Sequence, residues 1–117
     1  MARILAVDDD PLVRRAISRV LVNAGHEVVP AGHGADALQI ASDRAFDVAL
    51  VDYHLPFIDG LEVLQRLREV QPGCLRILVT GALDLPMIMD AVNRGEVMRV
   101  VEKPFESAGL VGAVEDA

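Results

Sequence analysis

Aromatic residues are scarce in this 117-residue chain, which has three phenylalanines, one tyrosine and no tryptophan. Proteins that bind single-stranded nucleic acid stack the bases on aromatic side chains. The small number of aromatic rings therefore argues against single-strand binding. The charge also has the wrong sign, because 18 acidic residues against 11 basic ones leave a net charge of −7. No apolar run approaches the roughly 20 residues of a membrane helix. We therefore expect neither direct nucleic-acid binding nor a membrane partner.

Cysteine and lysine each occur once, as Cys74 and Lys103. A single cysteine cannot form an internal disulfide, which fits a reducing compartment. The first apolar run, residues 4–7, is followed by three aspartates that no signal peptide would carry. These features predict a cytoplasmic location. The lone lysine has two explanations that the sequence leaves open: a lineage that uses arginine in place of lysine, or a position that requires a compact ammonium.

The length and the composition favour one folded domain. Apolar residues make up 52% of the chain and charged residues 25%, a balance typical of globular proteins and not of disordered ones. A chain of this length can bury one hydrophobic core, so we expect a single domain over residues 1–117. The sequence leaves open whether this domain stands alone or is part of a longer protein.

Short apolar runs alternate along the chain with segments of helical periodicity. The apolar runs predict strands at residues 3–7, 28–29, 47–51, 75–79 and 97–101. The periodic segments predict helices at residues 12–21, 35–42, 61–70, 85–93 and 107–114, the first capped by Asp10. Such alternation is typical of βαβ units and predicts an α/β fold with a parallel sheet. Right-handed crossovers then give the strand order 2-1-3-4-5, a three-layer, flavodoxin-like (βα)5 sandwich.

Polar residues stand where several of these strands end. The first strand is followed by Asp8, Asp9 and Asp10, the third by Asp52, the fourth by Thr80 and the fifth by Lys103. Ligands of open α/β sheets bind beyond the carboxyl ends of the strands, and in this strand order the four ends face one crevice. Adjacent carboxylates repel one another, and Mg²⁺, which prefers oxygen ligands, offsets that cost. With an ammonium and a hydroxyl beside them, the carboxylates fit phosphoryl transfer to an aspartate.

Four motifs occur in order along the chain, each at the end of a predicted strand. They are Val7–Asp10, Val51–Pro56 with Asp59-Gly60, Val79–Gly81 and Glu102–Phe105. In this order they resemble the receiver domain of bacterial two-component response regulators, in the CheY-like superfamily, and the resemblance extends over the whole chain. It implies a phosphorelay signalling domain that assists its own phosphorylation and dephosphorylation and is not an enzyme with a separate substrate.

By this resemblance, Asp52 is the phosphoacceptor. Its carboxylate would take a phosphoryl group from the phosphohistidine of a sensor histidine kinase or a histidine phosphotransfer protein. Thr80 and Lys103 would each contact a phosphoryl oxygen, and Pro104 would follow a cis peptide bond that aims the lysine.

The resemblance also implies Mg²⁺ as the cofactor. Asp9 would bind the ion directly and Asp8 through water, with Asp52 and the main-chain carbonyl of His54 completing the protein ligands. Asp10 is expected only to cap a helix, and Asp59-Gly60 to form a turn at a helix start, with no part in the chemistry. The other histidines, His26 and His33, are expected in surface loops.

The sequence departs from the family pattern at the position three residues before Lys103, where the family usually has tyrosine or phenylalanine and this chain has Val100. Valine has no long side chain to turn inward, which leaves open whether the aromatic part of the usual switch operates. The last predicted helix is short and contains Gly109 and Gly112. Both features weaken the family expectation of a homodimer, and they leave an output domain or a downstream protein as further partners.

Two other functions remain open at this stage. The same fold with Val100 is compatible with a docking module that acts without phosphorylation. The aspartates after the first strand also resemble those of haloacid-dehalogenase-type phosphatases. That fold needs a further acidic pair near a late strand and a cap domain, neither of which is visible, and it would leave Asp52 without a role.

Overall fold

The computed structural model describes residues 1–81 and 85–115, which form alternating strands and helices. The strands are β1 (Arg3–Val7), β2 (Glu27–Ala31), β3 (Val48–Asp52), β4 (Leu75–Thr80) and β5 (Arg99–Glu102). The helices are α1 (Pro11–Asn23), α2 (Gly34–Asp43), α3 (Gly60–Val70), α4 (Leu85–Asn93) and α5 (Ser107–Glu115). Among the residues described, no helix has the length and apolar character needed to cross a membrane.

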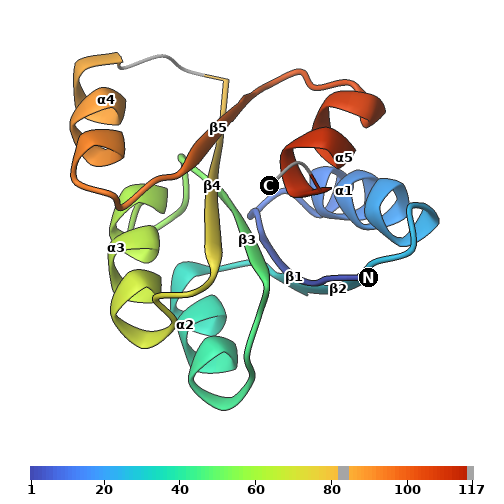
Figure 1. Ribbon diagram of the computed structural model, residues 1–117, viewed down its shortest axis with the longest axis horizontal. Helices are drawn as coiled ribbons and strands as arrows, with labels where there is room; N and C mark the ends of the chain where they lie inside the picture. Colours follow the sequence, from blue (N-terminus) through green and yellow to red (C-terminus); the bar gives the residue numbers. More distant parts are fainter. Residues whose placement is uncertain (82–84, 116–117) are drawn as a thin grey trace.

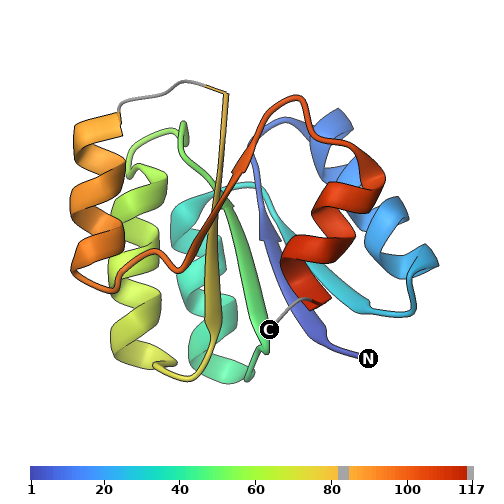
Figure 2. The ribbon, with the colours of Figure 1, turned by 45° about the horizontal axis from the view of Figure 1, so that its top comes forward.

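The five strands form one parallel sheet in the order β2-β1-β3-β4-β5, which confirms the predicted fold class. Helices α2, α3 and α4 cover one face of the sheet, and α1 and α5 cover the other (Figures 1 and 2). Since all five strands are parallel, the carboxyl ends of β1, β3, β4 and β5 lie at the same edge. This edge is the one at which the sequence places its polar residues.

Alternate residues of the central strands face two separate cores. From β1, Leu5 and Val7 pack against the side of α2, α3 and α4, whereas Ile4 and Ala6 pack against the side of α1 and α5. All residues of β3 are buried, as expected for a strand covered on both faces. At about 25 cal/mol per Å² of apolar surface removed from water, these two cores supply the main stabilisation of the sheet. They hold the strand ends in fixed positions.

The helix boundaries follow local signals in the sequence. The side chain of Asp10 accepts a hydrogen bond from the main-chain N of Leu12 at 2.9 Å, and Pro11 occupies the first turn of α1. Asp59 accepts from the main-chain N of Glu62 at 2.9 Å and caps α3 in the same way. Asp10 is therefore a helix cap, as predicted, and Asp59, which was predicted at a turn and helix start, caps α3 there.

The prediction for the fifth strand was wrong at its start, because β5 begins at Arg99 and not at residue 97. The main-chain N of Val97 donates back to the carbonyl of Ala91 in α4, so Val97 still belongs to the turn that ends this helix. The apolar character of Val97 reflects its burial in that turn. An apolar run alone does not separate a buried turn residue from a strand residue.

A buried arginine fixes the same turn. Arg76 of β4 is 2% exposed, and its guanidinium donates to four main-chain carbonyls. Two belong to the turn after α4, Gly95 at 2.9 Å and Glu96 at 3.1 Å. The other two, Cys74 at 3.1 Å and Pro72 at 3.3 Å, precede β4. The guanidinium therefore ties the start of β5 to the start of β4.

Candidate functional site

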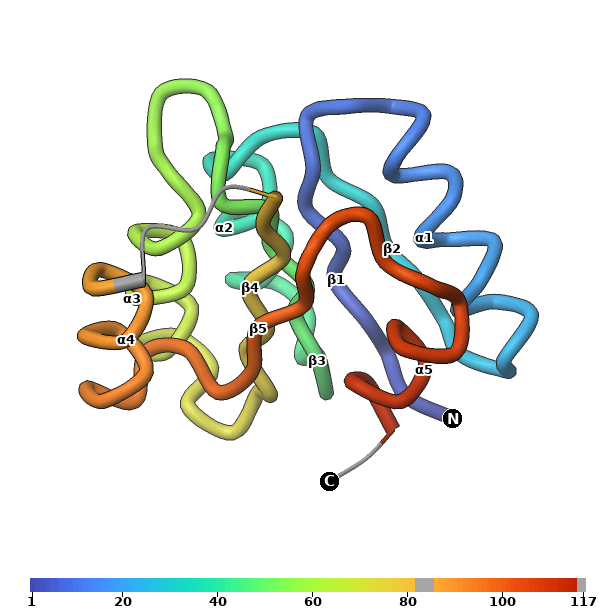
Figure 3. Tube along the Cα trace, turned by 90° about the horizontal axis from the view of Figure 1, so that it is seen from above, coloured from blue at the N-terminus to red at the C-terminus, as the bar shows by residue number. Residues whose placement is uncertain are grey.

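The predicted site residues meet at one edge of the sheet. Asp8 follows β1, Asp52 and Thr80 are the last residues of β3 and β4, and Lys103 follows β5. Figure 3 shows the loops after β1 and β3 at the same edge of the molecule. The topology thus brings together side chains that are up to 95 residues apart in the sequence, as for Lys103 and Asp8.

Three carboxylates form the acidic part of this site. One oxygen from each of Asp8, Asp9 and Asp52 lies within 4.8 Å of the other two. Asp8 and Asp52 are buried, at 2% and 6% exposed, whereas Asp9 is exposed. A group of like charges in a buried setting is unfavourable unless a cation balances it.

Lys103 supplies one such cation. Its Nζ lies 3.0 Å from Oδ2 of Asp8 and 3.0 Å from Oδ1 of Asp52. Burial acts to lower the pKa of Lys103, but hydrogen bonds to Asp52 and Asp8 outweigh it and hold the pKa above its ordinary value. The ammonium therefore stays charged, and its single nitrogen contacts both carboxylates.

The pKa of Asp52 is raised above its ordinary value. Burial of the carboxylate is the largest cause, and the negative charges of Asp8 and Asp9 add to it, while Lys103 acts in the opposite direction. One ammonium beside three carboxylates leaves an excess of negative charge at the site. Carboxylate oxygens are the donors that a hard divalent cation prefers, so the residues present fit Mg²⁺.

The loop after β3 is shaped around the carbonyl of Asp52. The main-chain N of Gly60 donates to the carbonyl of Tyr53 at 2.9 Å. A Cβ atom at Gly60 would lie 2.2 Å from the main-chain O of Asp52, a distance that no side chain can occupy. The glycine therefore lets α3 begin directly against the end of β3.

Thr80 ends β4 in full burial, at 0% exposed. The main-chain N of Lys103 donates to the carbonyl of Thr80 at 2.9 Å, which places the two residues side by side. The Lys103–Pro104 peptide bond is cis, as the family resemblance implied.

His54 lies beside the site with an exposed side chain. Its ring packs against that of Tyr53, with ring centroids 4.9 Å apart. Among the described residues, the group that could hold a metal consists of the three aspartates and does not include this imidazole. The sequence-based expectation for His54 concerns its main-chain carbonyl, and that role stays a prediction.

Arg14 is a residue that the sequence analysis did not connect with the site. Helical periodicity places it on the polar face of α1, but its Nη1 donates to the main-chain O of Asp8 at 2.7 Å. The side chain reaches back over the N-terminal end of the helix. The one signal in the sequence is the short separation of six residues between Arg14 and Asp8.

Comparison with known proteins identifies the family. The sequence profile of the response regulator receiver domain matches residues 4–115. The chain belongs to the response regulator receiver domain family. The response regulator receiver protein CpdR of Brucella abortus is 30% identical, over 98% of this chain and 95% of CpdR.

Solved structures agree with this assignment. A CheY-like receiver domain from Methanospirillum hungatei JF-1 superimposes with a TM-score of 0.93 and 29% identity, over 99% of this chain and 92% of that one. A response regulator from Burkholderia pseudomallei, solved with a phosphorylated aspartic acid, a calcium ion and citrate, has a TM-score of 0.89 and 25% identity. That match covers 98% of this chain and 67% of the other.

The receiver domain also occurs within larger proteins. The chain spans about a quarter of the length of the first curated relatives that it matches, which are transcriptional regulatory proteins. A histidine kinase is a further relative. Receiver domains of this family are signalling domains of two-component systems.

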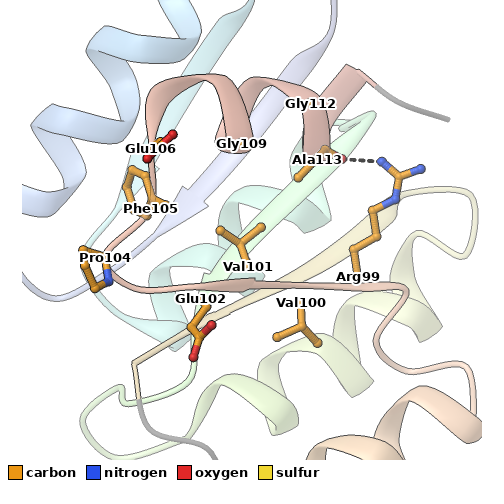
Figure 4. Close-up of a pocket in the computed structure, with 10 residues that line it drawn as sticks. All are labelled: Arg99, Val100, Val101, Glu102, Pro104, Phe105, Glu106, Gly109, Gly112 and Ala113. Atoms are coloured by element: carbon orange, nitrogen blue, oxygen red, sulfur yellow. Dashed lines mark hydrogen bonds between the residues drawn. The ribbon is translucent and has the colours of Figure 1, made fainter.

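The surface of β5 and α5 has the departures that the sequence analysis noted. Val100 is 41% exposed and occupies the position that is usually aromatic. Figure 4 shows Val100 on the side of β5 away from α5, while Arg99 reaches toward α5 and donates to the carbonyl of Ala113. A Cβ atom at Gly109 or Gly112 would meet no atom within 4 Å, so this face of α5 is open.

Proposed function

We propose that this receiver domain accepts a phosphoryl group on Asp52 in a Mg²⁺-dependent reaction. The donor is the phosphohistidine of a sensor histidine kinase or a histidine phosphotransfer protein. The observation that carries the proposal is the placement of the Asp52 carboxylate, 3.0 Å from Lys103 and grouped with the carboxylates of Asp8 and Asp9. Such an arrangement has one nucleophile, one fixed cation and a set of oxygen donors for a second cation.

In this reaction a carboxylate oxygen of Asp52 forms a bond to phosphorus while the P–N bond to the donor imidazole breaks. The electron pair of that bond stays on the nitrogen, and the ring leaves as neutral histidine because its other nitrogen carries a proton. The product on Asp52 is an acyl phosphate. A raised pKa makes the carboxylate a better nucleophile than an exposed aspartate once it is ionised.

Four groups would hold Mg²⁺: the carboxylates of Asp8, Asp9 and Asp52 and the main-chain carbonyl of His54. Asp9 is exposed and suited to direct binding. Asp8 already accepts hydrogen bonds on both oxygens, from the main-chain N of Asp10 and from Lys103, which suits contact through water. When bound, the ion would neutralise negative charge on the transferring phosphoryl group.

Lys103 and Thr80 would bind the other phosphoryl oxygens. The ammonium of Lys103 pairs with Asp52 and can transfer that contact to the phosphoryl group. The hydroxyl of Thr80, at the end of the neighbouring strand, would donate to another oxygen. Both interactions are charge-assisted hydrogen bonds, which are stronger than neutral ones.

The signal would then pass to an output domain, a downstream protein or a second copy of the chain. The longer relatives of this family, which include transcriptional regulatory proteins, support an output partner. We propose that the domain itself transfers no group to a separate substrate. The single cysteine, Cys74, is buried and unpaired, which is compatible with the cytoplasmic location expected from the sequence.

Phosphorylation can be tested by intact-protein mass spectrometry after incubation with acetyl phosphate and Mg²⁺. We expect one added phosphoryl group in the wild type and none in Asp52→Asn or after chelation of Mg²⁺. Asp59→Asn is the matched control, because it removes a carboxylate of the same loop that only caps α3. The absence of an adduct in the wild type would contradict the proposal and favour a docking module that acts without phosphorylation.

A further inference from the structure

We propose that Arg14 is a positioning residue for Mg²⁺ binding, because its guanidinium fixes the peptide group that joins Asp8 to Asp9. The inference rests on the proposed function, in which these two carboxylates hold Mg²⁺. Arg14 touches neither the expected ion nor the phosphoryl group and acts through the main chain.

The contact that carries the inference is a short hydrogen bond. Nη1 of Arg14 donates to the main-chain O of Asp8 at 2.7 Å, and the arginine is half-buried. The carbonyl of Asp8 and the N–H of Asp9 belong to one planar peptide group. Holding the oxygen therefore sets the orientation of the plane from which Asp9 projects.

The two aspartates differ in how they are held. The side chain of Asp8 is fixed on both oxygens, by the main-chain N of Asp10 at 2.9 Å and by Lys103 at 3.0 Å. Its main-chain N donates to the carbonyl of Ala31 at 3.1 Å. Within residues 1–81 and 85–115, no hydrogen bond or ion pair restrains the exposed carboxylate of Asp9. The direction of Asp9 therefore depends on its backbone, and so on Arg14.

Gly32, in the loop after β2, leaves room for this guanidinium. A Cβ atom at Gly32 would lie 3.2 Å from Nη1 of Arg14, which is closer than ordinary van der Waals contact. A larger side chain at position 32 would displace the guanidinium without changing any charge. The chain thus offers two independent ways to disturb the same hydrogen bond.

The direction in which the Mg²⁺ affinity changes distinguishes a positioning role of Arg14 from an effect of its charge. Arg14 is a cation close to the acidic site, and it repels Mg²⁺ through space. Loss of its charge alone would therefore strengthen Mg²⁺ binding. Loss of the hydrogen bond to the Asp8 carbonyl would leave Asp9 less ordered and weaken the binding. A weaker affinity in a neutral variant is thus specific to the positioning role.

The test is a titration of the whole chain with Mg²⁺ followed by ¹H–¹⁵N NMR, with thermal unfolding without Mg²⁺ as the measure of fold stability. We expect Arg14→Met to raise the Kd for Mg²⁺ about tenfold, the effect typical of losing a group that orients a metal ligand. The control is Arg15→Met, which removes the same charge from the exposed neighbouring position and should leave the Kd within about twofold. Arg14→Lys should recover part of the affinity.

Gly32→Leu provides the second variant, and Gly73→Leu is its control, because a Cβ atom at Gly73 meets no atom within 4 Å. We expect Gly32→Leu to weaken Mg²⁺ binding as Arg14→Met does. An unchanged or tighter Kd in both variants would overturn the role of Arg14, with wild-type binding intact. A wild type that binds no Mg²⁺ is a different result, and it would overturn the metal site together with the inference.

Discussion

Nζ of Lys103 lies 3.0 Å from Oδ1 of Asp52, yet this ion pair does not compensate fully for burial of the carboxylate. Burial, with help from the negative charges of Asp8 and Asp9, keeps the pKa of Asp52 above its ordinary value of 3.8 despite the lysine. The folded chain therefore binds the proton of Asp52 more tightly than the unfolded chain does. As the pH rises from 3.8 through the pKa of the folded state, ionisation of Asp52 lowers the stability of the fold.

The first prediction follows from this loss of stability on ionisation of Asp52. Asp52→Asn should raise the free energy of unfolding at neutral pH by about 1 kcal/mol, a size common for relief of strain at a functional site. The gain should shrink as the pH falls through the raised pKa toward 3.8, because Asp52 of the folded wild type then takes up its proton and the buried charge is lost. Urea denaturation across this pH range is the measurement. Asp43→Asn, at an exposed position, is the control, and an equal gain in that variant would contradict the explanation.

Mg²⁺ should stabilise the domain through Asp9. We expect Mg²⁺ to raise the melting temperature of the wild type, because an ion that binds only the folded state stabilises it by mass action. Asp9→Asn should lose this rise. Asp10→Asn removes the same charge from the next residue but keeps a residue that caps α1 well, so it should retain the rise. Differential scanning calorimetry with Mg²⁺ and with chelator measures both, and a Mg²⁺ response that persists in Asp9→Asn would exclude this residue as a ligand.

Arg76 should be essential to the fold although it lies far from the chemistry. Arg76→Met keeps most of the side-chain volume but leaves one buried and three half-buried carbonyls without the donors that Arg76 supplies. We expect the free energy of unfolding to fall by about 2–4 kcal/mol, since each unsatisfied buried group costs about 1–3 kcal/mol. Arg66→Met, at a helix position where the arginine pairs with Glu62 at 3.4 Å and with no other described residue, should cost less than about 0.5 kcal/mol. Urea denaturation of the two variants compares them, and similar losses would show that the carbonyl contacts of Arg76 contribute little.

The strands and the acidic site could be predicted because both depend on local patterns. The apolar runs identify β1, β3 and β4, and the rule that ligands bind at the carboxyl ends of strands then groups Asp8, Asp52 and Lys103. The family motifs add the roles, since each lies at such an end. The geometry agrees with this grouping, with both aspartates 3.0 Å from the lysine.

What the sequence could not show depends on contacts between distant residues. Arg76 interrupts an apolar strand, and two of its acceptors lie in the turn after α4, about twenty residues further along the chain. His26 was expected in a surface loop; it does lie in the loop between α1 and β2, but its side chain is only 7% exposed. Its Nδ1 accepts from the main-chain N of Ala2 at 3.0 Å, and its Nε2 lies 2.7 Å from Glu115. The periodicity of apolar residues predicts which face of a helix or strand a residue occupies. It does not predict which distant residues contact it on that face.

Phe57, in the loop after β3, should be a site at which substitution stabilises the domain. Its φ of 71° is one that residues with side chains rarely adopt, and its ring is 100% exposed. The main-chain N of Ile58 donates to the carbonyl of Pro56 at 2.9 Å, so the backbone makes a tight turn centred on Phe57. An exposed ring gains nothing from burial to offset the strained backbone.

We therefore expect Phe57→Asn to raise the free energy of unfolding by about 1 kcal/mol, because asparagine tolerates positive φ. Phe57→Val should lower it, since a β-branched side chain is the least compatible with this conformation. Phe57→Ala, which removes the ring but keeps the Cβ, separates the two causes. Urea denaturation can be followed by the fluorescence of Tyr53, the only tyrosine in a chain without tryptophan. Equal stability of the asparagine and valine variants would show that the backbone conformation at this position carries no cost.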